Sequence, residues 1–184
     1  MADRRRLSES ISEGDGISIL VDVGPHAEAL STIAGDAVGL LVPPGGVPAD
    51  DVLPVAVRGG TPAEAGASGA DGWLLVAGEG EDALVERYGE AGAIGLECVV
   101  EIRDEDELER VLAELDPEIV LLSPDHEELD GVARVLELLS DLPAGKLAIA
   151  ALAAPTSEDL AALERAGVDA ALIDLEHVAT LFGS

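Results

Sequence analysis

The chain contains few aromatic residues and almost no cysteine. Aromatic residues make up 2% of its 184 residues, and cysteine occurs once, at Cys98, within the apolar run 96–100. One thiol can form neither an internal disulfide nor a thiolate metal cluster, so folds that depend on either are excluded. We expect a core of Ala, Val, Leu and Ile in which Cys98 is a buried, inert thiol.

Basic residues are also scarce. Ten Lys and Arg residues stand against 38 Asp and Glu residues, which gives a formal net charge of −28. Phosphate backbones and anionic lipid surfaces would be repelled, so neither nucleic acid nor a membrane is expected as a partner. Self-repulsion of this size opposes a compact state and is reduced by counterions, so stability should rise with salt.

Long hydrophobic runs are missing as well. Gly, Pro or a charged residue interrupts every apolar stretch before it reaches the length of a membrane span. The arginines at 4–6 are followed by a polar, acidic stretch rather than by the apolar segment of an export signal. We therefore expect a cytoplasmic protein, with a polar N-terminal segment over residues 1–16 and a single domain over residues 17–184.

Short aliphatic runs recur along the rest of the chain. Most are apolar throughout rather than alternating, which is typical of parallel strands covered on both faces. Helix-like stretches with polar caps separate several of them. The predicted strands are 17–23, 37–42, 53–57, 73–77, 96–102, 119–122, 147–152 and 170–173, and the predicted helices are 80–90, 104–115, 127–140 and 157–165.

Capping residues support these boundaries. Asp104, with Glu107 three residues later, has the pattern of a helix N-cap with a capping box, and Ser157 could cap the helix that follows it. Glycines close helical runs where a left-handed turn leads into the next strand. They are Gly92, Gly95 and Gly167.

Eight strands favour a compact (β/α)8 TIM barrel, of α/β class, with short loops. Each unit averages about 23 residues, below the usual size for a fold that runs from about 200 residues upward. The segments 43–46 and 59–62 are rich in Pro and Gly and leave little room for helix, so some outer helices should be shortened or missing. An open, doubly wound sheet is the alternative.

Several segments resemble indole-3-glycerol-phosphate synthases. Residues 96–108 are similar to the fifth strand and following helix of that family, and residues 156–160 with 166–173 to its seventh helix and eighth strand. Segments 53–55 and 69–75 extend the likeness to strands three and four, so it covers roughly residues 17–175. The resemblance implies a TIM barrel that acts as a carboxy-lyase in tryptophan biosynthesis. The Ala-Gly-Val-Asp-Ala turn at 166–170 also occurs in other phosphate-binding barrels of the tryptophan and histidine pathways, which stay open.

The resemblance names two candidate catalytic residues. The family closes an indole ring with loss of carbon dioxide and water, which requires a lysine general acid, a carboxylate and a phosphate cradle. Glu101 matches the strand-five glutamate and should lie at the C-terminal mouth of the barrel. Arg58 falls on the strand-three lysine, and a guanidinium with a pKa above about 12 cannot deliver a proton. The simpler interpretation of Glu101 is a solvated carboxylate on the rim of the mouth.

Other residues of the family's machinery have no counterpart. The first strand lacks the family's Glu-x-Lys pair, although Asp22 offers one carboxylate. Lys146 is the only lysine and precedes the seventh strand, at the end of a barrel where residues serve stability. The strand-six asparagine falls on Leu122.

The phosphate cradle is replaced too. Its Ser-Gly pair after strand seven falls on Leu152 and Ala153, and its glycine after strand eight falls on Asp174. A carboxylate at Asp174 would repel phosphate, so a phosphorylated ligand is not expected.

No cofactor or metal is expected. Several acids and histidines could lie near the C-terminal ends of the strands, but their spacing matches no metal motif, and side chains of this kind on loops are usually solvated. His177 is in the last helical turn, and its sequence context suggests a functional role even less than that of the other candidates. The candidates weighed are Asp22, His26, Glu101, His126 and Asp174.

Three functions therefore remain open. The first is a pseudoenzyme, a degenerate member of the synthase family that binds an unknown protein or small neutral ligand. The second is a divergent enzyme that uses Glu101, Asp22 or Asp125 as a base, with or without a metal, on an unphosphorylated substrate. The third is a synthase-like lyase in which Arg58 and Glu101 perform the reaction at a reduced rate.

Overall fold

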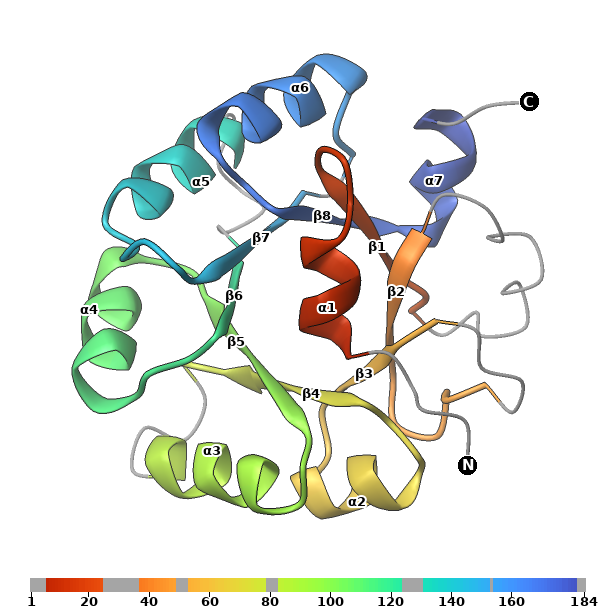
Figure 1. Ribbon diagram of the computed structural model, residues 1–184, viewed down its shortest axis with the longest axis vertical. Coiled ribbons are helices and arrows are strands. Elements are labelled where there is room, and N and C mark those ends of the chain that lie inside the picture. The colour runs from red at the N-terminus through yellow and green to blue at the C-terminus, as the bar shows by residue number, and fades with distance from the viewer. Residues whose placement is uncertain are drawn as a thin grey trace.

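The computed structural model describes residues 6–24, 37–48, 53–78, 83–123, 131–152 and 154–181. Eight parallel strands pair in sequence order into a closed barrel (Figure 1), which confirms the predicted fold. The barrel closes where β1 pairs with β8, from Ser18 opposite Ala170 to Asp22 opposite Asp174, so the open sheet is excluded. The strands are β1 (Ser18–Asp22), β2 (Ala37–Val42), β3 (Val55–Arg58), β4 (Gly72–Val76), β5 (Glu97–Ile102), β6 (Ile119–Leu122), β7 (Leu147–Ala151) and β8 (Ala170–Asp174).

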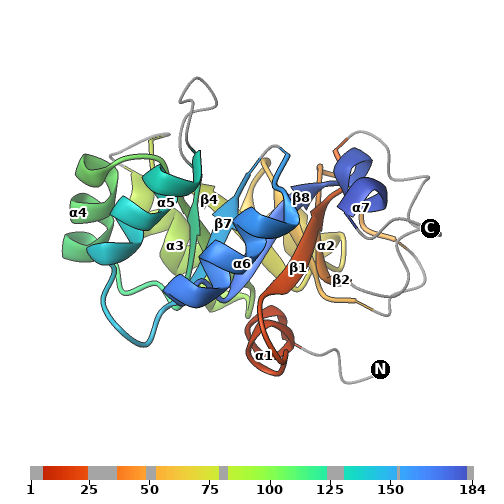
Figure 2. The ribbon, with the colours of Figure 1, turned by 90° about the horizontal axis from the view of Figure 1, so that it is seen from above.

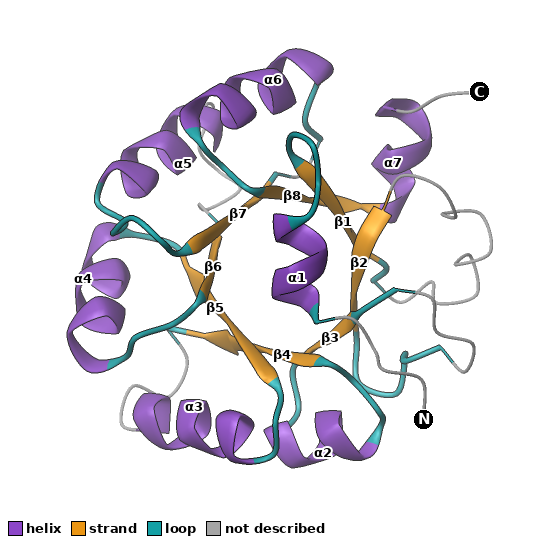
Figure 3. Ribbon diagram, viewed as in Figure 1, coloured by secondary structure: helices purple, strands orange, loops and turns teal. Residues whose placement is uncertain are grey.

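Helices surround the strands, as Figure 3 shows, and one further helix lies over an end of the barrel. The predicted shortening of outer helices is confirmed: α2 has six residues, and the described residues between β2 and β3 contain no helix. The predicted helices 80–90 and 127–140 begin outside the described residues, at 80–82 and 127–130. The helices are α1 (Leu7–Ser12), α2 (Pro62–Ala67), α3 (Leu84–Ala93), α4 (Glu105–Glu114), α5 (Gly131–Ser140), α6 (Ser157–Ala166) and α7 (Leu175–Leu181). None of these helices is both long and apolar enough to cross a membrane.

Strand residues divide into two aliphatic layers, because successive side chains of a strand point to opposite faces. One layer, the outer cluster, lies between the sheet and the helices and includes Val21, Leu75 and Ile102. The other, the inner cluster, fills the barrel and includes Leu20 and Leu121. Because each strand is apolar on both faces, it reads as a continuous aliphatic run in the sequence.

Helix α1 closes the N-terminal end of the barrel (Figure 2). Leu7 and Ile11, one turn apart, both belong to the inner cluster and are almost completely buried. Glu97, at the start of β5, holds the beginning of the helix: its Oε2 accepts the Leu7 N–H at 2.5 Å, and its Oε1 accepts the N–H and hydroxyl of Ser8. The polar composition of residues 1–16 did not predict this helix.

Gly39 of β2 makes room for the closing helix. A Cβ at this position would lie 2.8 Å from Leu7 Cδ1 and 2.8 Å from Leu20 Cδ2, closer than side chains approach one another. The glycine therefore lets the side chains of α1 and β1 meet inside the barrel. A strand glycine of this kind marks a place of close approach rather than a turn.

Helix caps follow the sequence with small differences. Asp104 Oδ1 accepts the Glu107 N–H at 2.8 Å as predicted. Helix α6 is capped by Thr156 rather than by Ser157, because Thr156 Oγ1 accepts the Asp159 N–H and the Asp159 side chain accepts hydrogen bonds from Thr156 in return. Gly95 and Gly167 have φ of 80° and 94°, in the left-handed region expected of them, whereas Gly92 lies within α3 and needs no such turn.

Candidate functional site

Four charged side chains are at inward positions where strands end. Asp22, Arg58 and Asp174 are the last residues of β1, β3 and β8, and Glu101 is the last but one of β5. Each comes two residues after a member of the inner cluster, so each faces the inside of the barrel at its C-terminal mouth. Enzymes of this fold carry their chemistry at that end. The structure therefore gathers these four sequence candidates at one place.

Arg58 is paired with Asp22. Arg58 Nη2 lies 2.9 Å from Asp22 Oδ2, and Asp22 Oδ1 accepts the Gly24 N–H at 3.0 Å. Both carboxylate oxygens are therefore engaged, which leaves Asp22 poorly placed to act as a general base. Because Arg58 is almost half exposed, the pair contributes at most about 1 kcal/mol to stability and mainly fixes the position of the guanidinium.

Glu101 is buried. It is 4% exposed, and it is the one charged residue classed as buried in the described part of the chain. Its ion-pair partner there is Arg103, whose Nε lies 3.7 Å from Glu101 Oε1, too far for a hydrogen bond. The interpretation of Glu101 as a solvated rim carboxylate is therefore wrong. Its oxygens are not among the fully buried polar atoms that lack a partner in the described residues, so they stay accessible to a molecule in the mouth. A carboxylate so weakly compensated still costs stability.

The backbone of Arg103 is bound by a side chain of α4. The Arg103 N–H donates to Glu107 Oε2 at 2.8 Å, and burial raises the pKa of the Glu107 carboxyl above its ordinary value. Arg110 Nη2 donates to the Ala77 carbonyl at 2.7 Å, and a Cβ on Gly78 would lie 2.4 Å from Glu107 Oε1. These contacts fix the start of the loop after β4 beside Glu101. Sequence reasoning had recognised Glu107 only as part of a helix cap.

Leu122 does not line the mouth. It belongs to the outer cluster and is completely buried under the helices, whereas Ile119 and Leu121 of the same strand face inward. The next inward position is Ser123, whose N–H continues the ladder to the Ile102 carbonyl at 2.9 Å. A shift of one residue moves a strand side chain to the opposite face, so the assignment of the family's asparagine to Leu122 is wrong.

The structure places only some of the other residues that replace the family's machinery. Leu152 packs against the outer cluster, while Ala153 lies outside the described residues. Lys146 precedes β7 at the end opposite the mouth, where it pairs with Asp116. No ammonium group of a lysine therefore reaches the mouth, since the sequence has no other lysine.

Metal binding finds no support in the described part of the chain. No group of three His, Cys, Asp or Glu side chains is placed there to hold an ion. His26, His126 and Asp125 lie outside the described residues. His177 is in α7, and its Nδ1 is buried without a hydrogen-bond partner among the described residues.

Comparison with known proteins confirms the resemblance seen in the sequence. The indole-3-glycerol phosphate synthase of Shouchella clausii (strain KSM-K16) is 34% identical over 108 residues, which is 57% of this chain and 42% of that protein. The synthase of Variovorax paradoxus (strain S110) is 36% identical over 112 residues, or 60% of this chain and 42% of its own. The chain thus spans less than half the length of these relatives. No family model matches it.

Solved structures agree on the fold. A mutant tryptophan synthase alpha-subunit from the hyperthermophile Pyrococcus furiosus matches with a TM-score of 0.67 and 15% identity, over 85% of this chain and 86% of that one. A cube-shaped protein cage designed by fusing symmetric oligomeric domains matches with a TM-score of 0.62 and 15% identity, over 86% of this chain and 63% of that one. At such identities the likeness extends to the barrel alone.

Proposed function

We propose that this chain is a binding barrel, similar to indole-3-glycerol phosphate synthases, that holds a small unphosphorylated molecule at its mouth and does not perform the synthase reaction. The observation that carries the proposal is the buried carboxylate of Glu101, which faces inward at the mouth with one distant ion-pair partner. A ligand that donates a hydrogen bond or carries an ammonium group would supply the compensation that the protein leaves out.

The expectation that the chain lacks synthase activity is supported by the identity of the cation at the mouth. By its resemblance, the reaction needs a lysine that donates a proton, and the position of that lysine is occupied by Arg58. A guanidinium is too weak an acid to deliver a proton, and this one is held by Asp22 at 2.9 Å. It can attract an anion but cannot serve as a general acid.

Asp174 argues against a phosphorylated ligand. Its side chain is exposed at the inward end of β8, next in register to Asp22. Like charges a few ångströms apart repel by on the order of 1 kcal/mol in water and by several where partly buried. That is enough to offset ordinary affinity for a phosphate group.

A direct assay tests the catalytic half of the proposal. Purified protein is incubated with carboxyphenylamino-deoxyribulose phosphate, and the indole product is followed by fluorescence, with the Shouchella clausii synthase as positive control. We expect no turnover above the uncatalysed rate and no growth of a tryptophan auxotroph that carries the gene. Turnover within tenfold of the control enzyme would show that Arg58 and Glu101 perform the reaction after all.

Stability measurements test the role of Glu101. We expect Glu101→Gln to raise the free energy of unfolding by about 1 kcal/mol, because it removes a buried charge while keeping the side-chain volume. Urea titration measures the change. The matched control on the same strand is Glu97→Gln, which should lower the free energy of unfolding by about 1 kcal/mol, because it weakens the bonds to the start of α1. If Glu101→Gln lowers it as well, Glu101 serves stability through Arg103 and the proposed ligand site loses its support.

A further inference from the structure

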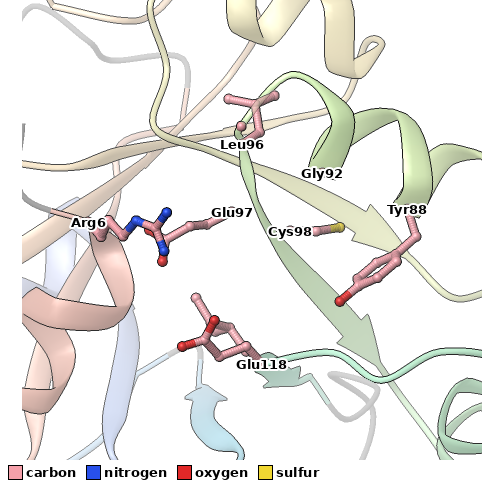
Figure 4. A pocket seen from close by; sticks show the side chains of 9 residues that line it. Arg6, Tyr88, Gly92, Leu96, Glu97, Cys98 and Glu118 are labelled. Atoms are coloured by element: carbon pink, nitrogen blue, oxygen red, sulfur yellow. The ribbon is translucent and has the colours of Figure 1, made fainter.

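A second pocket lies at the opposite end of the barrel from the mouth. It has a volume of about 220 Å³ and is formed by the residue before α1, the middle of α3 and the first residues of β5 and β6. As Figure 4 shows, Arg6, Glu97 and Glu118 gather on one side, and Cys98 and Tyr88 lie on the other. The pocket thus has a charged side and a neutral side.

The charged side holds one cation, Arg6, and two carboxylates, Glu97 and Glu118. Neither the Arg6 guanidinium nor the Glu118 carboxylate forms an ion pair with any residue in the described part of the chain. Glu97 lies between them, but its oxygens already accept hydrogen bonds from Leu7 and Ser8. Charges of both signs therefore border the same pocket.

The other side is neutral at physiological pH. Burial raises the pKa of the Cys98 thiol to about 12, so the thiol keeps its proton. Burial also raises the pKa of Tyr88, whose hydroxyl donates to the Asp116 carbonyl at 3.2 Å. Leu96 and Ile119 complete this side with apolar surface. Cys98, which was expected to be fully buried, is partly buried in the wall of this pocket.

We propose that this pocket binds an α-amino acid with an aliphatic side chain. The ligand carboxylate meets the Arg6 guanidinium, which is built for bidentate pairing, and its ammonium group meets Glu118. Its side chain lies against Cys98 and Tyr88. The pocket volume of about 220 Å³ is enough for the side chain of leucine or valine. The site is separate from the mouth and does not depend on the function proposed there.

Tyr88 provides the probe for the test. Tyrosine occurs once in the sequence, so tyrosine labelled with carbon-13 in the ring gives NMR signals from this pocket wall alone. L-leucine titrated into the full chain should shift these signals in a saturable way. Arg6→Ala and Glu118→Gln should each weaken binding at least tenfold. Both side chains are exposed, so the fold should survive, and circular dichroism checks that it does.

Matched controls separate the pocket from general charge effects. Arg165→Ala and Glu158→Gln remove exposed charges of the same types from α6, which does not border the pocket, and should leave the binding constant unchanged. Isoamylamine and 4-methylpentanoate, which carry only one of the two charges, should bind at least tenfold more weakly than leucine. The proposal is overturned if 20 mM leucine leaves the Tyr88 signals unmoved, if the Arg6 and Glu118 variants bind as the parent does, or if either single-charge analogue binds as tightly as leucine.

Discussion

Replacement of Leu7 by alanine should lower the free energy of unfolding by about 3 kcal/mol, the middle of the range for a fully buried leucine. Leu7 is 2% exposed and packs into the inner cluster, where the truncation would leave a cavity against Leu20 and Gly39. Urea denaturation followed by circular dichroism measures the loss. The effect is large because a helix of six residues would contribute to stability only through the side chains that it inserts into the barrel.

Val85→Ala is the control for this prediction. Val85 lies on α3 and is 55% exposed, so the same kind of truncation should cost less than about 0.5 kcal/mol. An equally small loss at Leu7 would mean that α1 rests on the barrel without contributing to its core, and that the N-terminal end of the barrel is closed by the strand side chains alone.

Added salt should stabilise the protein by several kcal/mol between 10 mM and 1 M KCl, a rise in midpoint temperature on the order of 10 °C. The formal charge of −28 is the cause, because counterions screen the repulsion among acids. Helix ends add to the repulsion: α6, with Arg165, is the only one of α1 to α7 with a basic residue in its last turn. Thermal melts at increasing KCl provide the measurement.

A double variant separates screening from other effects of salt. Glu90 and Glu114 are exposed in the last turns of α3 and α4, where a negative charge opposes the helix dipole. Glu90→Gln with Glu114→Gln should raise the midpoint at 10 mM KCl and leave it nearly unchanged at 1 M. If the melting temperature of the parent does not depend on KCl, the charges are already compensated and the expected salt dependence is wrong.

The two ends of the barrel raise different functional questions. At the mouth, Glu101 is buried, and Arg58 forms an ion pair with Asp22 that fixes a cation unable to donate a proton. At the other end, α1 leaves a pocket between Arg6 and Glu118 that has no counterpart in the expected chemistry. The residues proposed to bind a ligand at one end, Glu101 at the mouth and Arg6 with Glu118 at the other, are different, so each proposal can fail without the other.

The strands, most helices and the position of the mouth could be predicted from the sequence, because a parallel strand buried on both faces is apolar at every residue. The closing helix could not be predicted. Leu7 and Ile11 are the only two apolar residues of a six-residue helix, too few for a periodic signal, and their contacts with β2 depend on a glycine 32 residues away in the chain. The Leu122 assignment failed for a related reason, because alignment by residue type does not fix which face a strand side chain takes.

The sequence by itself determined the barrel, its aliphatic core, its acidity and the absence of a second lysine, since these depend on composition and on local pattern. Only the tertiary structure decided that Glu101 is buried, that Arg58 is bound to Asp22 and that Arg6 faces the same pocket as Glu118. Burial and pairing are properties of residues far apart in the chain that closure of the barrel brings together, and no local pattern records them.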